Sequence, residues 1–249
     1  MTAANTISPW LPYGRSGTGT RLYCFPHAGA SAAVYANWRD AAGDDLVVCP
    51  VQLPGRAARG REAAHHDARK LVNDVLSGLG SEFTGDYAIF GHSVGALTAY
   101  LVTRKIVEQG GRPPRHLFVS GRAAPHLPST RRELRALPVD DLVVELRALG
   151  GFPDVLQRDR ALLEMFLPLL RADLSVNETY RHVPGPPLPI PLTVFGGHGD
   201  PRADDAELAA WRELSADSAL FTYPGGHFYL EKRAPELLGV IRERLTVKV

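Results

Sequence analysis

Residues 87–96 of this 249-residue chain read Tyr-Ala-Ile-Phe-Gly-His-Ser-Val-Gly-Ala. The first four residues are apolar, which is typical of a strand that is buried on both faces of a parallel sheet. A helical stretch, residues 94–109, follows at once and ends before two glycines. The segment therefore predicts a buried strand, a tight turn that contains Ser93, and a helix.

The turn has the pattern Gly-x-Ser-x-Gly, which lifts a serine hydroxyl clear of the carboxyl end of a strand. Gly91 and Gly95 lie two residues before and after Ser93, where side-chain bulk would keep the strand and the helix apart. The N-terminus of the helix faces the hydroxyl and favours negative charge. The pattern also arises by chance, but its place between a buried strand and a helix makes Ser93 our candidate nucleophile.

Other short apolar runs end in turn residues and also predict buried strands. They are residues 21–25, 45–50, 116–120, 190–195 and 219–223. Helical stretches alternate with them, at residues 67–83, 94–109, 204–214 and 234–245. This alternation predicts an α/β fold, with a mostly parallel, doubly wound sheet and right-handed crossovers.

One segment, residues 127–187, interrupts the alternation because it has no strand signal. It predicts two helices, residues 139–149 and 158–180, and Pro168 should kink or split the second. A helical insertion between two strands is typical of a lid over a site, and an extra helical layer on the core is the alternative. We therefore divide the chain into a core, residues 1–126 and 188–249, and a lid insertion, residues 127–187.

Two polar residues follow later strands in glycine-rich turns. Asp200 ends the run Gly-Gly-His-Gly-Asp, and His227 ends the run Gly-Gly-His. Ligand sites of open α/β sheets lie at the carboxyl ends of strands, so Ser93, Asp200 and His227 should meet there. Taken singly, Asp200 could be a helix N-cap and His227 a turn residue. Together, in the order serine, aspartate, histidine, they predict a catalytic triad.

The tetrahedral intermediate of such a triad needs backbone donors for its oxyanion. The first expected donor is the amide of Val94, directly after the nucleophile. The second should come from the loop after an early strand, where Phe-Pro-His-Ala-Gly occupies residues 25–29. Its small residues let an amide turn toward the site, and Ala28 is our candidate.

The composition limits the partners and the compartment. Lys and Arg number 28 and Asp and Glu number 27, so a long-range attraction to nucleic acid or to an anionic membrane is not expected. Cys24 and Cys49 are expected to be buried free thiols. No motif suggests a metal site, and no signal peptide or spanning segment is visible. A cytoplasmic protein is therefore expected.

Six motifs together resemble the type II thioesterases, which are stand-alone editing enzymes of polyketide and nonribosomal peptide biosynthesis in the α/β-hydrolase superfamily. The motifs cover residues 25–29, 53–56, 91–96, 120–125, 196–200 and 225–228, in the order of the family. Val94 stands where the family usually has Met, and Ala30 where it often has Gly. These departures affect the shape of the pocket rather than the backbone donors.

The resemblance implies an α/β-hydrolase fold that hydrolyses acyl thioesters on the phosphopantetheine arm of an acyl or peptidyl carrier protein, a transient partner. It implies no permanently bound cofactor. The lid would cover the acyl chain, with Leu162, Met165, Phe166 and Leu169 as candidate lining residues unless they pack in the core. Carrier proteins are usually acidic, so Arg56, Arg122, Arg131 and Arg132 are candidate docking residues unless they form an ordinary solvated surface.

The triad does not distinguish a sulfur from an oxygen leaving group. A general carboxylesterase or lipase, or an acyltransferase, is therefore an alternative enzyme. A non-catalytic protein that binds carriers is the alternative from another class.

Overall fold

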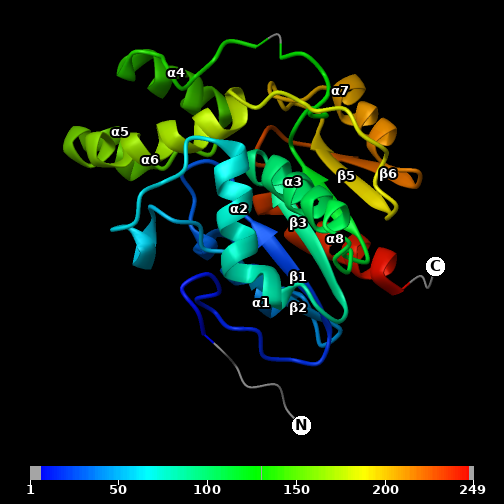
Figure 1. Cartoon of the computed structure of the whole chain (residues 1–249). Coiled ribbons are helices and arrows are strands. Elements are labelled where there is room, and N and C mark those ends of the chain that lie inside the picture. The colour runs from blue at the N-terminus through cyan, green and yellow to red at the C-terminus, as the bar shows by residue number, and fades with distance from the viewer. Residues whose placement is uncertain (1–6, 130, 247–249) are drawn as a thin grey trace.

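A computed structural model describes residues 7–129 and 131–246 of the chain. The ends of the predicted core and Thr130 of the predicted insertion lie outside the described residues. Six strands form one sheet in the order β2-β1-β3-β4-β5-β6, and every neighbouring pair is parallel (Figure 1). The strands are β1 (Thr20–Phe25), β2 (Leu46–Pro50), β3 (Tyr87–His92), β4 (Leu117–Ser120), β5 (Leu192–Gly197) and β6 (Ser218–Tyr223). The predicted doubly wound parallel sheet is confirmed.

Helices cover both faces of the sheet. On one face lie α2 (Ala68–Leu79), α3 (Val94–Glu108) and α7 (Asp205–Ala209), and on the other lie α1 (Ala36–Ala41) and α8 (Leu230–Thr246). No pattern in the sequence indicates α1, which is only six residues long. No helix in the described part of the chain is long and apolar enough to cross a membrane.

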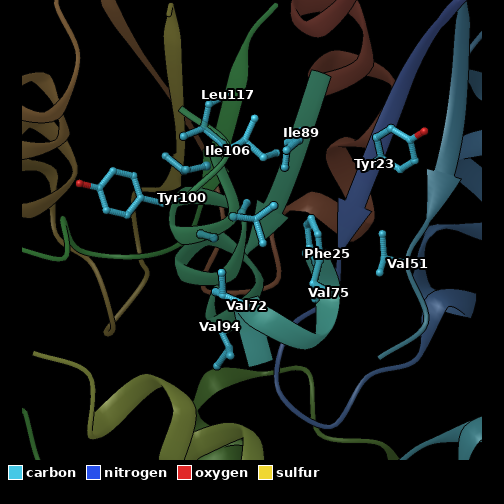
Figure 2. Close-up of a cluster of buried hydrophobic side chains, with 14 of the residues drawn as sticks. Tyr23, Phe25, Val51, Val72, Val75, Ile89, Val94, Tyr100, Ile106 and Leu117 are labelled. Carbon is cyan, nitrogen blue, oxygen red and sulfur yellow. The ribbon is translucent and has the colours of Figure 1, made fainter. Parts of the chain in front are cut away.

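The strands are apolar at successive positions because both of their faces are buried. Tyr23 and Phe25 of β1 point into the cluster under α2 and α3, which Figure 2 shows, whereas Leu22 and Cys24 join the cluster under α1 and α8. Val94, the first residue of α3, is buried in the first of these clusters. Cys24 and Cys49 are both buried and free, which confirms the expectation for the thiols.

The segment between β4 and β5 forms three helices, α4 (Val139–Leu149), α5 (Asp154–Arg158) and α6 (Arg160–Glu178). Pro168 does not split the second helix, because α6 continues through it. The helices α5 and α6 are separated instead at Asp159, whose backbone is extended (φ −118°, ψ 103°) and whose side chain accepts a hydrogen bond from the Leu162 N–H at 3.0 Å. Pro168 sits on the exposed side of α6, where water can satisfy the carbonyl that its ring leaves unpaired.

The insertion has a small apolar core of its own. Seven buried leucines from its loops and helices form it: Leu134, Leu137, Leu142, Leu163, Leu167, Leu170 and Leu174. The four on α6 recur at spacings of three and four residues, so they form one stripe along that helix. Most of the apolar face of α6 is therefore covered within the insertion itself.

Candidate active site

Ser93 occupies a strained turn between β3 and α3. Its φ of 56° and ψ of −118° are rare for a residue with a side chain, and such a conformation costs about 1–3 kcal/mol. A Cβ on Gly91 would lie 2.0 Å from the Gly95 carbonyl oxygen, and one on Gly95 would lie 2.2 Å from the Phe25 carbonyl oxygen. The two glycines of the motif are therefore required by backbone contacts on both sides of the serine.

The backbone of the turn is tied to the neighbouring strand. The Ser93 N–H donates to the Ser120 carbonyl at 2.8 Å. Because Ser93 precedes the first turn of α3, the N–H of Val94 has no acceptor within the helix. The predicted role of Val94 in the oxyanion hole requires such a free amide next to the serine, and the role itself stays a prediction.

Asp200 and His227 lie side by side at the next strand ends. Nδ1 of His227 is 2.8 Å from Oδ2 of Asp200, and both side chains are buried. Since a carboxylate only accepts hydrogen bonds, Nδ1 carries the proton and Nε2 is left as the basic nitrogen. Oδ1 of Asp200 accepts from the Arg202 N–H at 2.8 Å, so both carboxylate oxygens are satisfied.

Glycines bring the two loops that carry this pair into contact. A Cβ on Gly197 would lie 2.5 Å from the Gly226 carbonyl oxygen, and the Gly199 N–H donates to the Gly225 carbonyl at 2.8 Å. His198, between these glycines, is exposed. The loop geometry thus directs Asp200 inward and leaves the neighbouring histidine in solvent.

His92, the buried neighbour of Ser93 in the chain, packs against His227. The rings of His92 and His227 are 4.9 Å apart between centroids, and His92 is fully buried. Nδ1 of His92 lies 2.9 Å from Oγ of Ser120, which lies 2.7 Å from the Tyr229 hydroxyl. Burial, with His227 and His27 close by, lowers the pKa of His92 well below its usual range. His92 is therefore neutral beside the candidate base.

His27 adds a second neutral imidazole on the same side. Its ring centroid lies 5.9 Å from that of His92 and 4.9 Å from that of Phe228. Burial lowers the pKa of His27 to about 3, and the nearby His227 and Arg56 act in the same direction. His92 packs against His227 and His27 packs behind His92, and because both rings are uncharged, neither opposes a positive charge that develops on His227.

Ala28 lies in a tight turn beside this cluster. The Ala30 N–H donates to the His27 carbonyl at 3.1 Å, and the Gly29 N–H donates to Oδ2 of Asp173 in α6 at 2.7 Å. Among the described residues no acceptor for the Ala28 N–H is found. Ala28 is half-buried and contacts both the core under α3 and the leucine core of the insertion.

Ser93 opens onto a cavity of about 640 Å³. Its other walls come from residues 121–129 and 131–133 after β4, from the end of α6 and the strap that follows it within residues 177–184, and from Arg202 and Glu207. Residues of the insertion therefore line the cavity beside Ser93, and both polar and apolar side chains contribute, but the four apolar residues that we predicted do not.

The predicted lining of an acyl pocket is corrected by this geometry. Leu162, Met165, Phe166 and Leu169 are not among the residues that line the cavity. Met165 is 79% exposed, and Phe166 lies instead against Gly29 in the loop of residues 25–30, which holds Ala28 and is called the oxyanion loop after its predicted role. The reason is the orientation of α6: its buried stripe faces the other leucines of the insertion, and only its last turn reaches the cavity.

The four candidate docking arginines separate into different environments. The prediction for Arg56 is wrong, because this residue is 5% exposed and its guanidinium binds the Asp173 carboxylate at 2.7 Å. Arg122 lines the cavity, where its Nε donates to Asn177 at 2.9 Å, and burial lowers its pKa to about 10. Arg131 also lines the cavity and forms a bidentate salt bridge with the Glu207 carboxylate. Arg132 is the most exposed of them.

Sequence reasoning missed several residues of the site. Ser120 and Tyr229 hold His92, Asp173 holds the oxyanion loop, and Asn177 holds Arg122. Ser120 ends the predicted strand β4, and Asp173 lies within a predicted helix. Their hydrogen-bond partners are distant in the sequence, so the local pattern does not indicate these contacts. Only the place of Ser120 at a strand end, next to Gly121, gave a usable signal.

A strained serine at a strand-to-helix turn, with a buried aspartate–histidine pair on the same edge of a parallel sheet, defines an α/β-hydrolase. A family model described as thioesterase domain matches residues 20–245. The chain belongs to this thioesterase family and is a hydrolase that acts on thioesters.

Relatives support this membership over the whole chain. The gramicidin S biosynthesis protein GrsT of Aneurinibacillus migulanus is 33% identical over 248 residues, which cover 98% of this chain and 97% of that protein. The medium-chain S-acyl fatty acid synthase thioesterase of Homo sapiens is 32% identical over 228 residues, which cover 88% and 83%.

Solved structures agree. BorB, described as the type II thioesterase from the borrelidin biosynthetic cluster, superimposes with a TM-score of 0.87 at 35% identity and covers 96% of this chain and 99% of its own. RedJ, the thioesterase from the prodiginine biosynthetic pathway in Streptomyces coelicolor, gives 0.86 at 36% identity with the same coverage.

Proposed function

We propose that this thioesterase removes acyl groups from the phosphopantetheine arm of acyl or peptidyl carrier proteins in polyketide or nonribosomal peptide biosynthesis, for editing or for release. The observation that carries the proposal is that Ser93 opens onto a large cavity on the same sheet edge as the buried Asp200–His227 pair. Relatives that span nearly the whole chain belong to such pathways.

In the acylation step the Ser93 hydroxyl attacks the thioester carbonyl while Nε2 of His227 takes the hydroxyl proton. Asp200 keeps the proton on Nδ1 and stabilises the imidazolium. The amides of Val94 and Ala28 hold the oxyanion. Collapse of the tetrahedral intermediate breaks the carbon–sulfur bond, and the arm leaves as a thiol with the proton from His227.

In the second step water hydrolyses the acyl-enzyme. Nε2 of His227 takes a proton from the water as its oxygen attacks the acyl carbonyl, and then returns a proton to the departing Ser93 oxygen. The imidazolium forms in both steps. The neutral state of His27 and His92 at pH 7 favours it, because a charged neighbour would raise its energy.

Charges around the cavity suit an acidic partner and its phosphate. The arginines in its wall are Arg122, Arg131, Arg132, Arg181 and Arg202, and the carboxylates are Glu133, Glu178 and Glu207. This excess of positive charge would attract the acidic surface or the phosphate of a loaded carrier. The arm belongs to the carrier, so the proposal needs no cofactor bound to the thioesterase. Two buried free thiols suit a reducing compartment, and we place the reaction in the cytoplasm.

The proposal is tested with three substrates that share one acyl chain: an acyl-carrier protein, the acyl-pantetheine thioester and a p-nitrophenyl ester. We expect the largest kcat/KM for the acyl-carrier protein. A preference for the oxygen ester would instead make the protein a carboxylesterase, and transfer of the acyl group to an added alcohol in place of water would make it an acyltransferase. Absence of a Ser93 adduct with a fluorophosphonate would make it a non-catalytic binder of carriers.

A further inference from the structure

The carboxylate of Asp173 joins the insertion to the oxyanion loop. Asp173 is 4% exposed and lies in the second half of α6. Oδ2 accepts hydrogen bonds from the Gly29 N–H at 2.7 Å and from Nη1 of Arg56 at 2.8 Å, while Oδ1 accepts from Nη2 of Arg56 at 2.7 Å. Nη1 of Arg56 also donates to the Ala30 carbonyl at 3.0 Å. The carboxylate thus binds the loop both directly and through Arg56.

The same loop is held sterically by another residue of α6. Gly29 has a φ of +73°, and a Cβ at this position would lie 2.4 Å from Cζ of Phe166. Phe166 and Asp173 are seven residues apart, or two turns of one helix, so they lie on the same side of α6. A seated α6 therefore fixes both the position of Gly29 and the direction of its N–H.

Peptide planarity carries this restraint to Ala28. The Gly29 N–H shares a rigid plane with the Ala28 carbonyl, and the Ala28 N–H shares the preceding plane with the His27 carbonyl. The first plane is held by Asp173, and the second by the bond from the Ala30 N–H to the His27 carbonyl. Because the peptide planes on both sides of Ala28 are held by these hydrogen bonds, the orientation of the free Ala28 N–H is fixed.

We propose that Asp173 is a positioning residue for the oxyanion hole, through which the seating of α6 on the core sets the direction of the Ala28 N–H. This inference rests on the proposed function because it uses Ala28 as an oxyanion donor. It makes the insertion part of the catalytic machinery: when α6 is displaced, the donor loses its direction and acylation of Ser93 slows.

The double variant Arg56→Met with Asp173→Leu is the sharpest test. Replacing both members of a buried ion pair with apolar residues of similar size is often neutral or stabilising, so the variant should fold. We expect kcat to fall about 10- to 100-fold and KM to change less than about twofold. This fall in kcat is smaller than the loss of about 10²–10³-fold for a missing oxyanion donor, because the Ala28 N–H is misdirected rather than removed. The rate of Ser93 labelling by a fluorophosphonate should fall in parallel.

The matched control is Asp140→Asn, which removes an exposed ion pair between α4 and Arg160 of α6 and touches no part of the loop. It should leave both rates unchanged. A folded double variant with the kcat and labelling rate of the control would overturn the inference. If circular dichroism shows that the double variant does not fold, Asp173→Asn decides by the same two rates, with a fall of about fivefold or more expected. Fluorophosphonate labelling that depends on Asp173 in a protein with no thioesterase activity would support the inference while rejecting the proposed function.

Discussion

The sheet edge and the insertion are held in place by different kinds of contact. At the sheet edge, backbone atoms of β3, α3 and β1 approach so closely that only glycine fits at residues 91 and 95. In the insertion, three helices rest on a cluster of leucines and on exposed ion pairs such as that of Arg160 with Asp140. Backbone contacts therefore exclude a side chain at these two positions of the sheet edge, whereas the insertion is held mainly by contacts between side chains.

The sheet edge and the insertion contribute different parts of the site. Ser93, His227 and Asp200, the residues of the predicted triad, all sit on the rigid part, where geometry is set by the strands. The insertion contributes part of the cavity wall and one buried carboxylate, Asp173, that reaches the rigid part. Changes at the sheet edge should consequently act on chemistry and stability, and most changes in the insertion should act weakly.

The largest contrast is expected between two aspartates. Asp200→Asn should lower kcat by about 10⁴-fold, because the amide no longer holds the correct tautomer of His227. Asp140→Asn, in the insertion, should leave kcat within about twofold, since its carboxylate is exposed and a surface pair contributes at most about 1 kcal/mol. Steady-state hydrolysis of acyl-pantetheine measures both. Similar losses in the two variants would break the comparison.

Two glycines test the same contrast in stability. Gly95→Ala should lower the free energy of unfolding by about 3 kcal/mol, because its Cβ would overlap the Phe25 carbonyl oxygen. Gly150→Ala, at the end of α4, should cost only about 1–2 kcal/mol, since its φ of +90° disfavours a side chain but no atom lies within 4 Å of the new Cβ. Urea denaturation measures both changes, and a larger cost at Gly150 would count against the account.

Protonation of His27 should make the free energy of unfolding depend on pH. Its pKa is about 3 in the folded protein and about 6.5 when unfolded, so the unfolded chain binds more protons between these values. The free energy of unfolding should therefore fall as the pH drops from 6.5 toward 3, with up to about 1.4 kcal/mol per pH unit from this group. His27→Asn should flatten this slope, whereas replacement of the exposed His66 by Asn should not. Equal slopes in both variants would refute the assignment.

The smallest effect is expected at the exposed arginine of the cavity rim. Arg132→Glu should raise KM about threefold or more for an acyl-carrier protein and leave KM for acyl-pantetheine unchanged, because only the carrier has an extended acidic surface. Arg158→Glu, on α5 away from the cavity, is the matched control and should change neither value. Equal changes with both substrates would show that Arg132 does not meet the carrier.

The sequence predicted the sheet edge far better than the insertion, and the contacts explain why. Gly91, Gly95 and Ser93 are restricted by backbone geometry within a few residues, so the motif itself reports the structure. Asp200 and His227 could be placed because parallel strands bring their ends together. That Ser93, Asp200 and His227 act as a triad stays a prediction.

The insertion gave a weaker signal for a physical reason. The spacing of leucines in α6 predicts an apolar face but not what covers that face, so Met165 was assigned to a pocket although it is exposed. Arg56 and Asp173 are 117 residues apart, and nothing local to either one indicates the other. A charged residue in a loop, such as Arg56, therefore looks like part of a docking surface although it is a buried partner.

The central claim is tested most directly by intact-mass measurement of a set of acyl-loaded carrier proteins before and after exposure to the protein. The account predicts that the carrier loses the mass of its acyl group and keeps its phosphopantetheine arm, with a transient acyl adduct on Ser93, and that Ser93→Ala leaves the loaded carriers intact. Unchanged carrier masses with the wild-type protein, or equal deacylation by Ser93→Ala, would contradict it.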